Sequence, residues 1–238
     1  MQIQIHDNKM RHIKTTTAFN AIKEFGDTIH IDNFFTEDQL QLCENAASPK
    51  ETTQSIYPYG VFPNQLIAEY KQLNDDEVVR NMFINIFANL FECEKSKFDI
   101  SDLTLVTLHL PWDIHNDLHK NKIKLGFRYG YNFLIPLEDV NSRTIIFEQS
   151  SEDTNHFSEY KKNHGKVPNP VDSKFWEDNL SFCWPHDREY LSLKEALPYQ
   201  RRRQLLGFKR NIFHSSDNFH IRGISKKNFI QVRLDFAI

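Results

Sequence analysis

The sequence predicts an α+β fold, in which an N-terminal helical layer packs against a β-sandwich or barrel. Two observations lead to this prediction. Apolar residues recur at helical spacing in the first part of the chain, whereas from about residue 100 apolar and polar residues alternate and β-branched residues become frequent. Helices that come early in a chain and strands that come late are typical of the α+β class.

Two segments carry the helical pattern. Residues 28–47 favour a short strand followed by a helix, and Thr36 with Gln39 forms the sequence pattern of a capping box. Residues 74–94 predict a stronger helix, because acidic residues occupy the first turn and apolar residues recur three or four positions apart. We interpret this apolar stripe as core packing; its members are Val79, Met82, Phe83, Ile86, Leu90 and Phe91.

The strand pattern follows in the second half of the chain. Turn-forming residues bound apolar, β-branched segments at 103–110, 131–140, 143–150, 207–214 and 228–238. Between them, residues 150–200 lack a clean period and contain several prolines, so we expect a long insertion, which is typical of a lid or a disordered loop. We expect a single domain over 1–238, with a mainly helical layer over 1–99 and a β-barrel core over 100–238.

Composition excludes several classes of function. The chain has 238 residues, of which 39% are hydrophobic and 20 are Phe, and this apolar content is enough for a real core. The net charge of −3 argues neither for nucleic acid nor for an anionic membrane surface as a partner. With only 7 glycines there is no Gly-rich phosphate-binding loop.

Cysteines and hydropathy predict a cytoplasmic protein. Cys43, Cys93 and Cys183 are odd in number and far apart, so their spacing suggests neither a zinc site nor a disulfide framework. The first residues contain no apolar signal segment, and no run of apolar residues approaches membrane-spanning length.

Two His-x-Asp pairs, His115–Asp117 and His30–Asp32, are candidates for part of a metal site. A non-haem iron(II) site needs two imidazoles and one carboxylate on the same face of the metal. In an extended segment, residues i and i+2 point to the same side, so either pair meets the local requirement. We favour His115–Asp117, because it follows a predicted strand, whereas His30–Asp32 leads into a helix.

A third ligand has to come from elsewhere in the fold. His214 ends an apolar run just before a polar turn, which places an imidazole at the end of a strand. Among its rivals, His109 is on a comparable strand; six residues before His115, it lies on the same side and could line the site without binding. The other rivals are His119, His156, His164, His186 and His220.

The order of these segments resembles the 2-oxoglutarate and iron(II)-dependent oxygenases, and the resemblance covers roughly residues 28–238. It begins with "HIDNFFTEDQL" and continues through "HND", "FLIPLEDV" and "TIIFEQ" to "GFKRNIFHSSDNF" and "GISKKNFIQVRLDF". The resemblance implies a double-stranded β-helix, which is a jelly-roll or cupin-like barrel, with N-terminal helices packed on one face.

The resemblance also implies roles for individual residues. His115, Asp117 and His214 match the iron ligands, and the presence of Asp117 favours hydroxylation, because family members that halogenate lack this carboxylate. Lys227 matches the basic residue that holds the distal carboxylate of 2-oxoglutarate, and Arg233 is the second choice. The third candidate, Arg222, is followed by a glycine and hence by an expected turn, whereas Lys226 is expected to point outward.

The implied cofactors are Fe(2+) and the co-substrate 2-oxoglutarate, with O2 consumed and succinate and CO2 released. The substrate would be a small molecule or a peptide, which this sequence does not identify further. Two alternatives stay open: a non-catalytic jelly-roll binding protein, and a metal-dependent cupin enzyme that does not use 2-oxoglutarate.

The arginines at 201–203 and the aromatic residues of the insertion each allow two interpretations. The arginines at 201–203 either steer an acidic substrate or form a solvated basic face. Four aromatic residues of the insertion either form an apolar wall for substrate or anchor the insertion to the barrel: Trp176, Phe182, Trp184 and Tyr190.

Overall fold

Two antiparallel sheets form the framework of the computed structural model, which describes residues 3–4, 22–56, 61–118, 125–199 and 202–238. The large sheet has the strand order β1-β2-β9-β6-β11-β5-β4-β3, and the small sheet has the order β10-β7-β8. The large sheet contains β1 (Ile3–Gln4), β2 (Thr28–Ile31), β3 (Thr53–Ile56), β4 (Leu66–Gln72), β5 (Phe98–Leu108), β6 (Phe127–Pro136), β9 (Leu205–Lys209) and β11 (Lys227–Ala237). The small sheet contains β7 (Ser142–Ser150), β8 (Leu193–Tyr199) and β10 (Ile212–Ser216).

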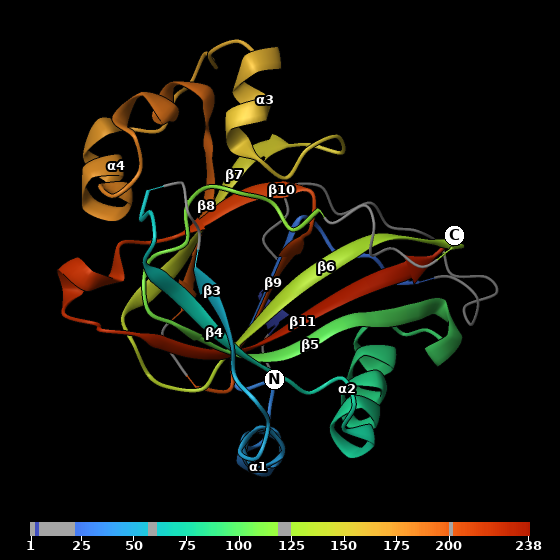
Figure 1. Cartoon of the computed structure of the whole chain (residues 1–238). Coiled ribbons are helices and arrows are strands. Elements are labelled where there is room, and N and C mark those ends of the chain that lie inside the picture. Colours follow the sequence, from blue (N-terminus) through green and yellow to red (C-terminus); the bar gives the residue numbers. More distant parts are fainter. Residues whose placement is uncertain (1–2, 5–21, 57–60, 119–124, 200–201) are drawn as a thin grey trace.

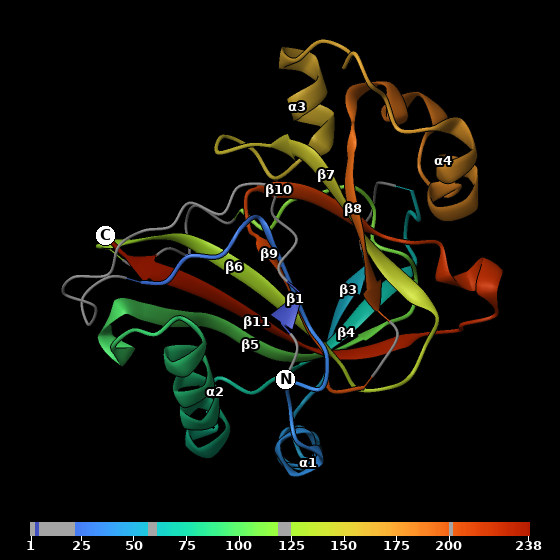
Figure 2. The ribbon, with the colours of Figure 1, turned by 180° about the vertical axis from the view of Figure 1, so that it is seen from behind.

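Helices cover the outer faces of both sheets, as Figures 1 and 2 show from opposite sides. Helices α1 (Glu37–Ala47) and α2 (Glu77–Leu90) lie on the large sheet, and α3 (Phe157–Asn163) and α4 (Ser173–Leu180) lie beyond the small sheet. Three groups of buried apolar residues follow from this layering: one between α1–α2 and the large sheet, one between the two sheets, and one between the small sheet and α3–α4. The predicted α+β fold is therefore confirmed.

The pleat of β11 separates a core face from a cavity face. Ile230, Val232 and Leu234 are fully buried against the helical layer. Phe229 and Arg233, which have the opposite parity, line the space between the sheets. Because side chains alternate along a strand, one central strand contributes both to the core and to a possible site.

The predicted core role of the α2 stripe is confirmed. Asp76 caps the helix by accepting a hydrogen bond from the backbone N–H of Val79 at 3.0 Å. Phe83 and Phe87 are fully buried, and the Phe87 ring lies 4.8 Å from that of Phe133 on β6. The capping box predicted for α1 is also present. Within the described residues, no helix has the length and apolar character needed to cross a membrane.

Two predicted boundaries are wrong. Residues 1–99 are not mainly a helical layer, because β2, β3 and β4 also belong to the large sheet. Residues 207–214 are not one strand: the chain turns at Arg210–Asn211, so β9 pairs in the large sheet and β10 in the small sheet. The turn is stabilised where the buried Arg210 pairs with Asp235, an interaction that local apolar pattern does not reveal.

The insertion is shorter and more regular than predicted. Its helices α3 and α4 pack on the small sheet through buried residues such as Phe157 and Trp176. The segment after them, β8, is a strand of the small sheet, so the insertion ends near residue 192. The strand β8 was not predicted, and it contains Pro198, a residue that is unfavourable inside a sheet. Proline is tolerated here because β8 is an edge strand.

The packing of α2 on the large sheet leads to a first prediction. Phe87→Ala should lower the free energy of unfolding by about 3–5 kcal/mol, because it leaves a cavity among closely packed rings. Val78→Ala, which changes an exposed residue of the same helix, should change it by less than about 0.5 kcal/mol. Urea unfolding followed by far-UV circular dichroism measures both; equal effects would contradict the packing described here.

Candidate metal centre and cavity

A cavity of about 830 Å3 lies between the two sheets. The large sheet contributes residues of β4, β5, β6 and β11, and the small sheet contributes residues of β7, β8 and β10. Residues of the insertion, including Lys161 and Trp184, form part of its wall. The cavity therefore brings together histidine, carboxylate and basic side chains from distant parts of the sequence.

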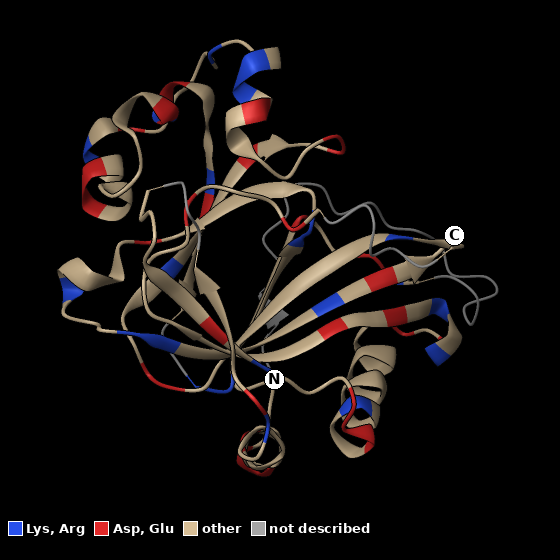
Figure 3. Ribbon diagram, in the orientation of Figure 1, with Lys and Arg blue, Asp and Glu red and all other residues tan. Residues whose placement is uncertain are grey.

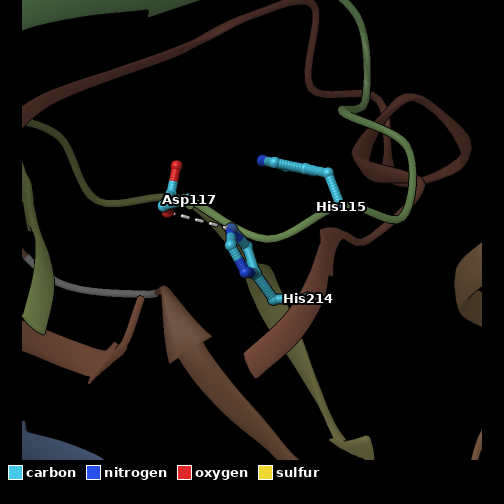
Figure 4. A group of neighbouring side chains, drawn as sticks. All are labelled: His115, Asp117 and His214. Atoms are coloured by element: carbon cyan, nitrogen blue, oxygen red, sulfur yellow. Dashed lines mark ion pairs between the residues drawn. The ribbon is translucent and has the colours of Figure 1, made fainter. Parts of the chain in front are cut away.

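His115, Asp117 and His214 converge at this cavity, as Figure 4 shows. Their possible ligand atoms all lie within 4.8 Å of one another. Nε2 of His214 is 3.3 Å from Oδ2 of Asp117, and the two imidazole ring centroids are 4.4 Å apart. The three residues that the sequence suggested as a cluster are thus brought together.

Backbone hydrogen bonds hold the 112–118 segment against β10. The N–H of His115 donates to the carbonyl of His214 at 3.0 Å, and the N–H of His214 donates back to His115 at 2.8 Å. The N–H of Asp117 donates to the carbonyl of Arg210 at 2.9 Å, and the Arg210 guanidinium donates in return to the carbonyl of Asp117. The segment forms only isolated bridges, from His115 to His156 and to His214, rather than the extended strand that we expected, and the hydrogen bonds above fix it instead.

The two imidazoles are oriented by backbone carbonyls. Nδ1 of His115 lies 2.7 Å from the carbonyl of Asp113, and Nδ1 of His214 lies 3.0 Å from the carbonyl of Ile212. These contacts favour the tautomer that carries its proton on Nδ1, which leaves the Nε2 lone pair available to a metal ion.

The electrostatics give each group the protonation state that a metal ligand needs. Burial and the neighbouring His214 lower the pKa of His115 to about 4, and burial also lowers the pKa of His214. Burial alone would raise the pKa of Asp117, but Arg233 and the two imidazoles hold it well below its usual range. At neutral pH the cluster therefore consists of two neutral imidazoles and one carboxylate.

Both carboxylate oxygens of Asp117 have partners outside the cluster. The amide of Asn132 on β6 donates to Oδ2 at 2.6 Å, and Nη2 of Arg233 lies 3.0 Å from Oδ1. Arg233 also pairs with Asp102 on β5 at 3.3 Å. These contacts restrict the carboxylate to one orientation.

Lys227 lies elsewhere along β11 on the wall of the same cavity, and it is 2% exposed. Its ammonium donates to the hydroxyl of Ser142 at 3.0 Å and lies 4.8 Å from the centroid of the Tyr199 ring. Asp217 is 4.0 Å away but is engaged by Ser142 and Arg222. Burial, with Arg222 nearby, lowers the pKa of Lys227 to about 7, because the ammonium has lost most of its hydration.

Of the rival residues, His156 and His186 line the cavity without joining the cluster, and the candidates described next lie outside its wall. His30 and Asp32 contact each other and the amide of Gln204, away from the cluster. We considered that His109 could line the site, but it does not line the cavity. Its Nε2 lies 3.0 Å from the carboxylate of Glu69. Arg222 pairs with Asp217 and does not line the cavity.

The arginines at 201–203 form neither a steering patch nor a solvated face where they are described. Arg202 pairs with Glu37 and Glu44 of α1, and Arg203 donates to the carbonyl of Phe35. They tie the start of α1 to the segment before β9. Arg201 and His119, which we also considered, lie outside the described residues.

The aromatic residues of the insertion divide between the two interpretations. Trp176 is buried and Tyr190 partly buried among the residues that anchor the insertion to the small sheet. Phe182 stacks on Phe62, which lines the cavity, with ring centroids 5.8 Å apart. Trp184 is 61% exposed and lines the cavity itself.

Sequence analysis missed three residues that position the cluster: Asn132, Asp102 and Arg210. Asn132 is a buried amide within the apolar β6 and Arg210 a charged residue between two apolar strands, so each interrupts a pattern. A polar residue inside a core strand needs a partner, and this is the signal that could have marked Asn132 and Arg210. Asp102 comes directly before the predicted strand 103–110, where a polar residue is unremarkable.

The sequence matches no family model, and a search of curated proteins finds no match. Solved structures do match. The non-haem alpha ketoglutarate dependent carbocyclase SnoK from nogalamycin biosynthesis aligns with a TM-score of 0.53 and 13% identity over 88% of this chain and 79% of that chain. The epimerase SnoN, solved with Fe3+, alpha ketoglutarate and nogalamycin RO, has a TM-score of 0.52 and 10% identity over 89% and 79%.

A third match is HygX from Streptomyces hygroscopicus, solved with nickel and 2-oxoglutarate bound. It has a TM-score of 0.52 and 9% identity over 89% of this chain and 83% of that chain. At these identities the likeness concerns the fold, which is the jelly-roll double-stranded β-helix of 2-oxoglutarate and iron(II) oxygenases. The predicted barrel type is confirmed.

The buried Arg210 leads to a second prediction. Arg210→Met should lower the free energy of unfolding by about 3–5 kcal/mol, because it leaves Asp235 buried without its partner and frees the carbonyl of Asp117. The double variant Arg210→Met/Asp235→Leu should recover part of this loss. Arg128→Met, which breaks an exposed pair with Glu24, should cost less than about 1 kcal/mol in the same urea titration. A loss of unfolding free energy as small as that of Arg128→Met would contradict the proposed role of Arg210 in holding Asp235 and Asp117.

Proposed function

We propose that this protein is an Fe(II)- and 2-oxoglutarate-dependent dioxygenase that hydroxylates a small-molecule or peptide substrate. The observation that carries the proposal is the convergence of His115, Asp117 and His214 on one cavity, with ligand atoms within 4.8 Å. The fold supports it, since the solved structures that share this barrel include enzymes with 2-oxoglutarate bound.

The residues present fit iron(II). Two neutral imidazoles and one carboxylate form the donor set of the non-haem iron(II) oxygenases. Hydrogen bonds from Nδ1 of both histidines and from Asn132 to Asp117 orient the donors, as ligand-supporting residues do in metal proteins. His115, Asp117 and His214 would hold the metal.

The residues also fit 2-oxoglutarate. Lys227 is a buried cation on the cavity wall whose nearest carboxylate, Asp217 at 4.0 Å, is engaged by Ser142 and Arg222, so it is suited to the distal carboxylate of the co-substrate. Arg233, our second candidate, is already engaged by Asp117 and Asp102. We therefore assign Lys227 as the anchor and Arg233 to the orientation of Asp117.

Iron(II) with 2-oxoglutarate supplies an oxidant for unactivated C–H bonds, and the co-substrate leaves as succinate and CO2. The protein's own contribution is to orient both groups and to exclude water with the apolar residues between the sheets, such as Phe208 and Leu134. Asp117 favours hydroxylation, because it occupies the position that a halide would need. We expect action in the cytoplasm, where reducing conditions keep both iron(II) and the buried cysteine thiols reduced.

The ligand assignment leads to a third prediction. His115→Ala, Asp117→Ala and His214→Ala should each abolish 2-oxoglutarate turnover, because two remaining donors do not hold the metal. His109→Ala, which changes a histidine outside the cavity wall, should retain it. Succinate release with iron(II), ascorbate and oxygen is the measurement.

The same assay separates the alternatives. A non-catalytic binding protein would release no succinate in the wild type, and a cupin enzyme of another kind would bind the metal but not consume 2-oxoglutarate. Succinate release that persists in His115→Ala or His214→Ala would reject the assigned ligands.

The anchor leads to a fourth prediction. Lys227→Met should raise the Kd of 2-oxoglutarate about 30-fold or more, because it leaves a carboxylate without its partner in a dry cavity. Lys226→Met removes the same charge from the exposed neighbouring position and should leave the Kd unchanged. Calorimetric titration of the nickel-loaded protein measures both.

The lowered pKa of Lys227 adds a pH dependence to this prediction. The free protein binds the co-substrate in the protonated form, which prevails below the pKa of about 7. The affinity should therefore be constant below pH 7 and fall by up to about tenfold for each pH unit above it. In Lys227→Met this slope should vanish; a slope that remains would assign the anchor to another group.

A further inference from the structure

Most of the charges that line the cavity are paired with one another. Arg233 pairs with both Asp102 and Asp117. At the side formed by the insertion, the ammonium of Lys161 pairs with Asp187. Lys161 and Asp187 neutralise each other, whereas Arg233 offsets only one of its two carboxylate partners. Figure 3 shows the same mixture outside the cavity, where basic and acidic segments alternate on α3 and α4.

Two charges of the cavity wall stand apart from this pairing. Lys227 is the first, and the proposed function assigns it to the distal carboxylate of 2-oxoglutarate. Asp113 is the second. In the part of the chain that the structure describes, its carboxylate accepts a hydrogen bond from its own backbone N–H but has no ion pair, and it interacts at longer range with His115, His156 and Asp187.

The charge of Asp113 also stays uncompensated when the proposed cofactors are counted. Iron(II) carries two positive charges and 2-oxoglutarate two negative ones, so together they add nothing. Arg233 and Lys227 together offset the two carboxylates of Asp102 and Asp117, and Lys161 offsets Asp187. With histidine counted as neutral, the cavity keeps one negative charge in total, and Asp113 is the carboxylate of its wall that has no ion pair among the described residues.

Two tryptophans, Trp112 and Trp184, line the same cavity as Asp113. Trp112 precedes it in the chain, lines the cavity and lies 6.4 Å from the ring of Tyr70. The backbone N–H of Ile114 donates to the sulfur of Cys183, which brings the segment of Trp184 against the segment of Asp113. Tryptophan faces attract organic cations, and a nearby carboxylate adds a Coulombic attraction.

We propose that the substrate carries an organic ammonium group, and that Asp113 binds this cation at the side of the cavity where Trp112 and Trp184 lie. The inference rests on the proposed function, and it narrows the substrate to amines or quaternary ammonium compounds. Asp113 is a binding residue here: its backbone carbonyl orients His115, whereas its carboxylate faces the substrate.

Choline and 3,3-dimethylbutan-1-ol test this inference, because they have the same shape and differ by one positive charge. The protein loaded with nickel(II) and 2-oxoglutarate is titrated with each compound by calorimetry in an amine-free buffer. Wild type should bind choline about tenfold more tightly than the neutral alcohol. Asp113→Asn should reduce this ratio to within about twofold, and Asp38→Asn, which removes an exposed carboxylate of α1, should preserve it.

Equal binding of the two compounds to wild type would overturn the inference, as would a preference that survives in Asp113→Asn. If Asp113→Asn fails to fold, Trp184→Ala serves instead, since it changes an exposed side chain and should weaken choline binding severalfold without weakening the alcohol equally. The same titrations on the metal-free protein separate the two proposals. Absence of nickel and 2-oxoglutarate binding would reject the proposed function, while the choline preference would still be measured.

Discussion

The reciprocal clamp between the 112–118 segment and the start of β10 is the constraint on which the site depends. Two backbone hydrogen bonds join His115 to His214, and Arg210 holds Asp117 from both its carbonyl and its guanidinium. The segment has little regular structure of its own, so without these bonds its side chains would be free to point in several directions. The two bonds between His115 and His214 join backbone atoms, so they hold the two histidines together whatever their side chains bind.

The layered fold explains why this clamp can be rigid. Helices α1 and α2 cover the outer face of the large sheet, and α3 and α4 cover that of the small sheet, so both walls of the cavity are backed by a packed core. Alternate residues of β11 take part in each role, with Val232 in the core and Arg233 beside Asp117. A movement of the strand would therefore disturb the core and the cluster together.

The electrostatics of the cavity follow a simple rule. Charges that serve to position other groups form close ion pairs, as Arg233 does with Asp117 and Asp102. Lys227 and Asp113, which the proposals assign to bound molecules, have no ion pair shorter than 4.0 Å among the described residues. A buried charge without a partner is unfavourable in the free protein, and a ligand of opposite charge can offset that cost. Such residues are therefore informative about what binds.

The sequence by itself determined the α+β class, the helix cap at Thr36, the core stripe of α2 and the members of the cluster, because each depends on local spacing or on the order of segments. Only the tertiary structure decided that residues 207–214 divide between two sheets, that β8 belongs to the barrel, and that Arg233 is engaged by Asp117 while the carboxylate nearest to Lys227 is 4.0 Å away. The physical reason is that strand pairing and charge pairing join residues distant in sequence, as Arg210 joins Asp235 and Asn132 joins Asp117. Periodicity records which side of a strand a residue occupies, but it carries no information about which partner it meets there.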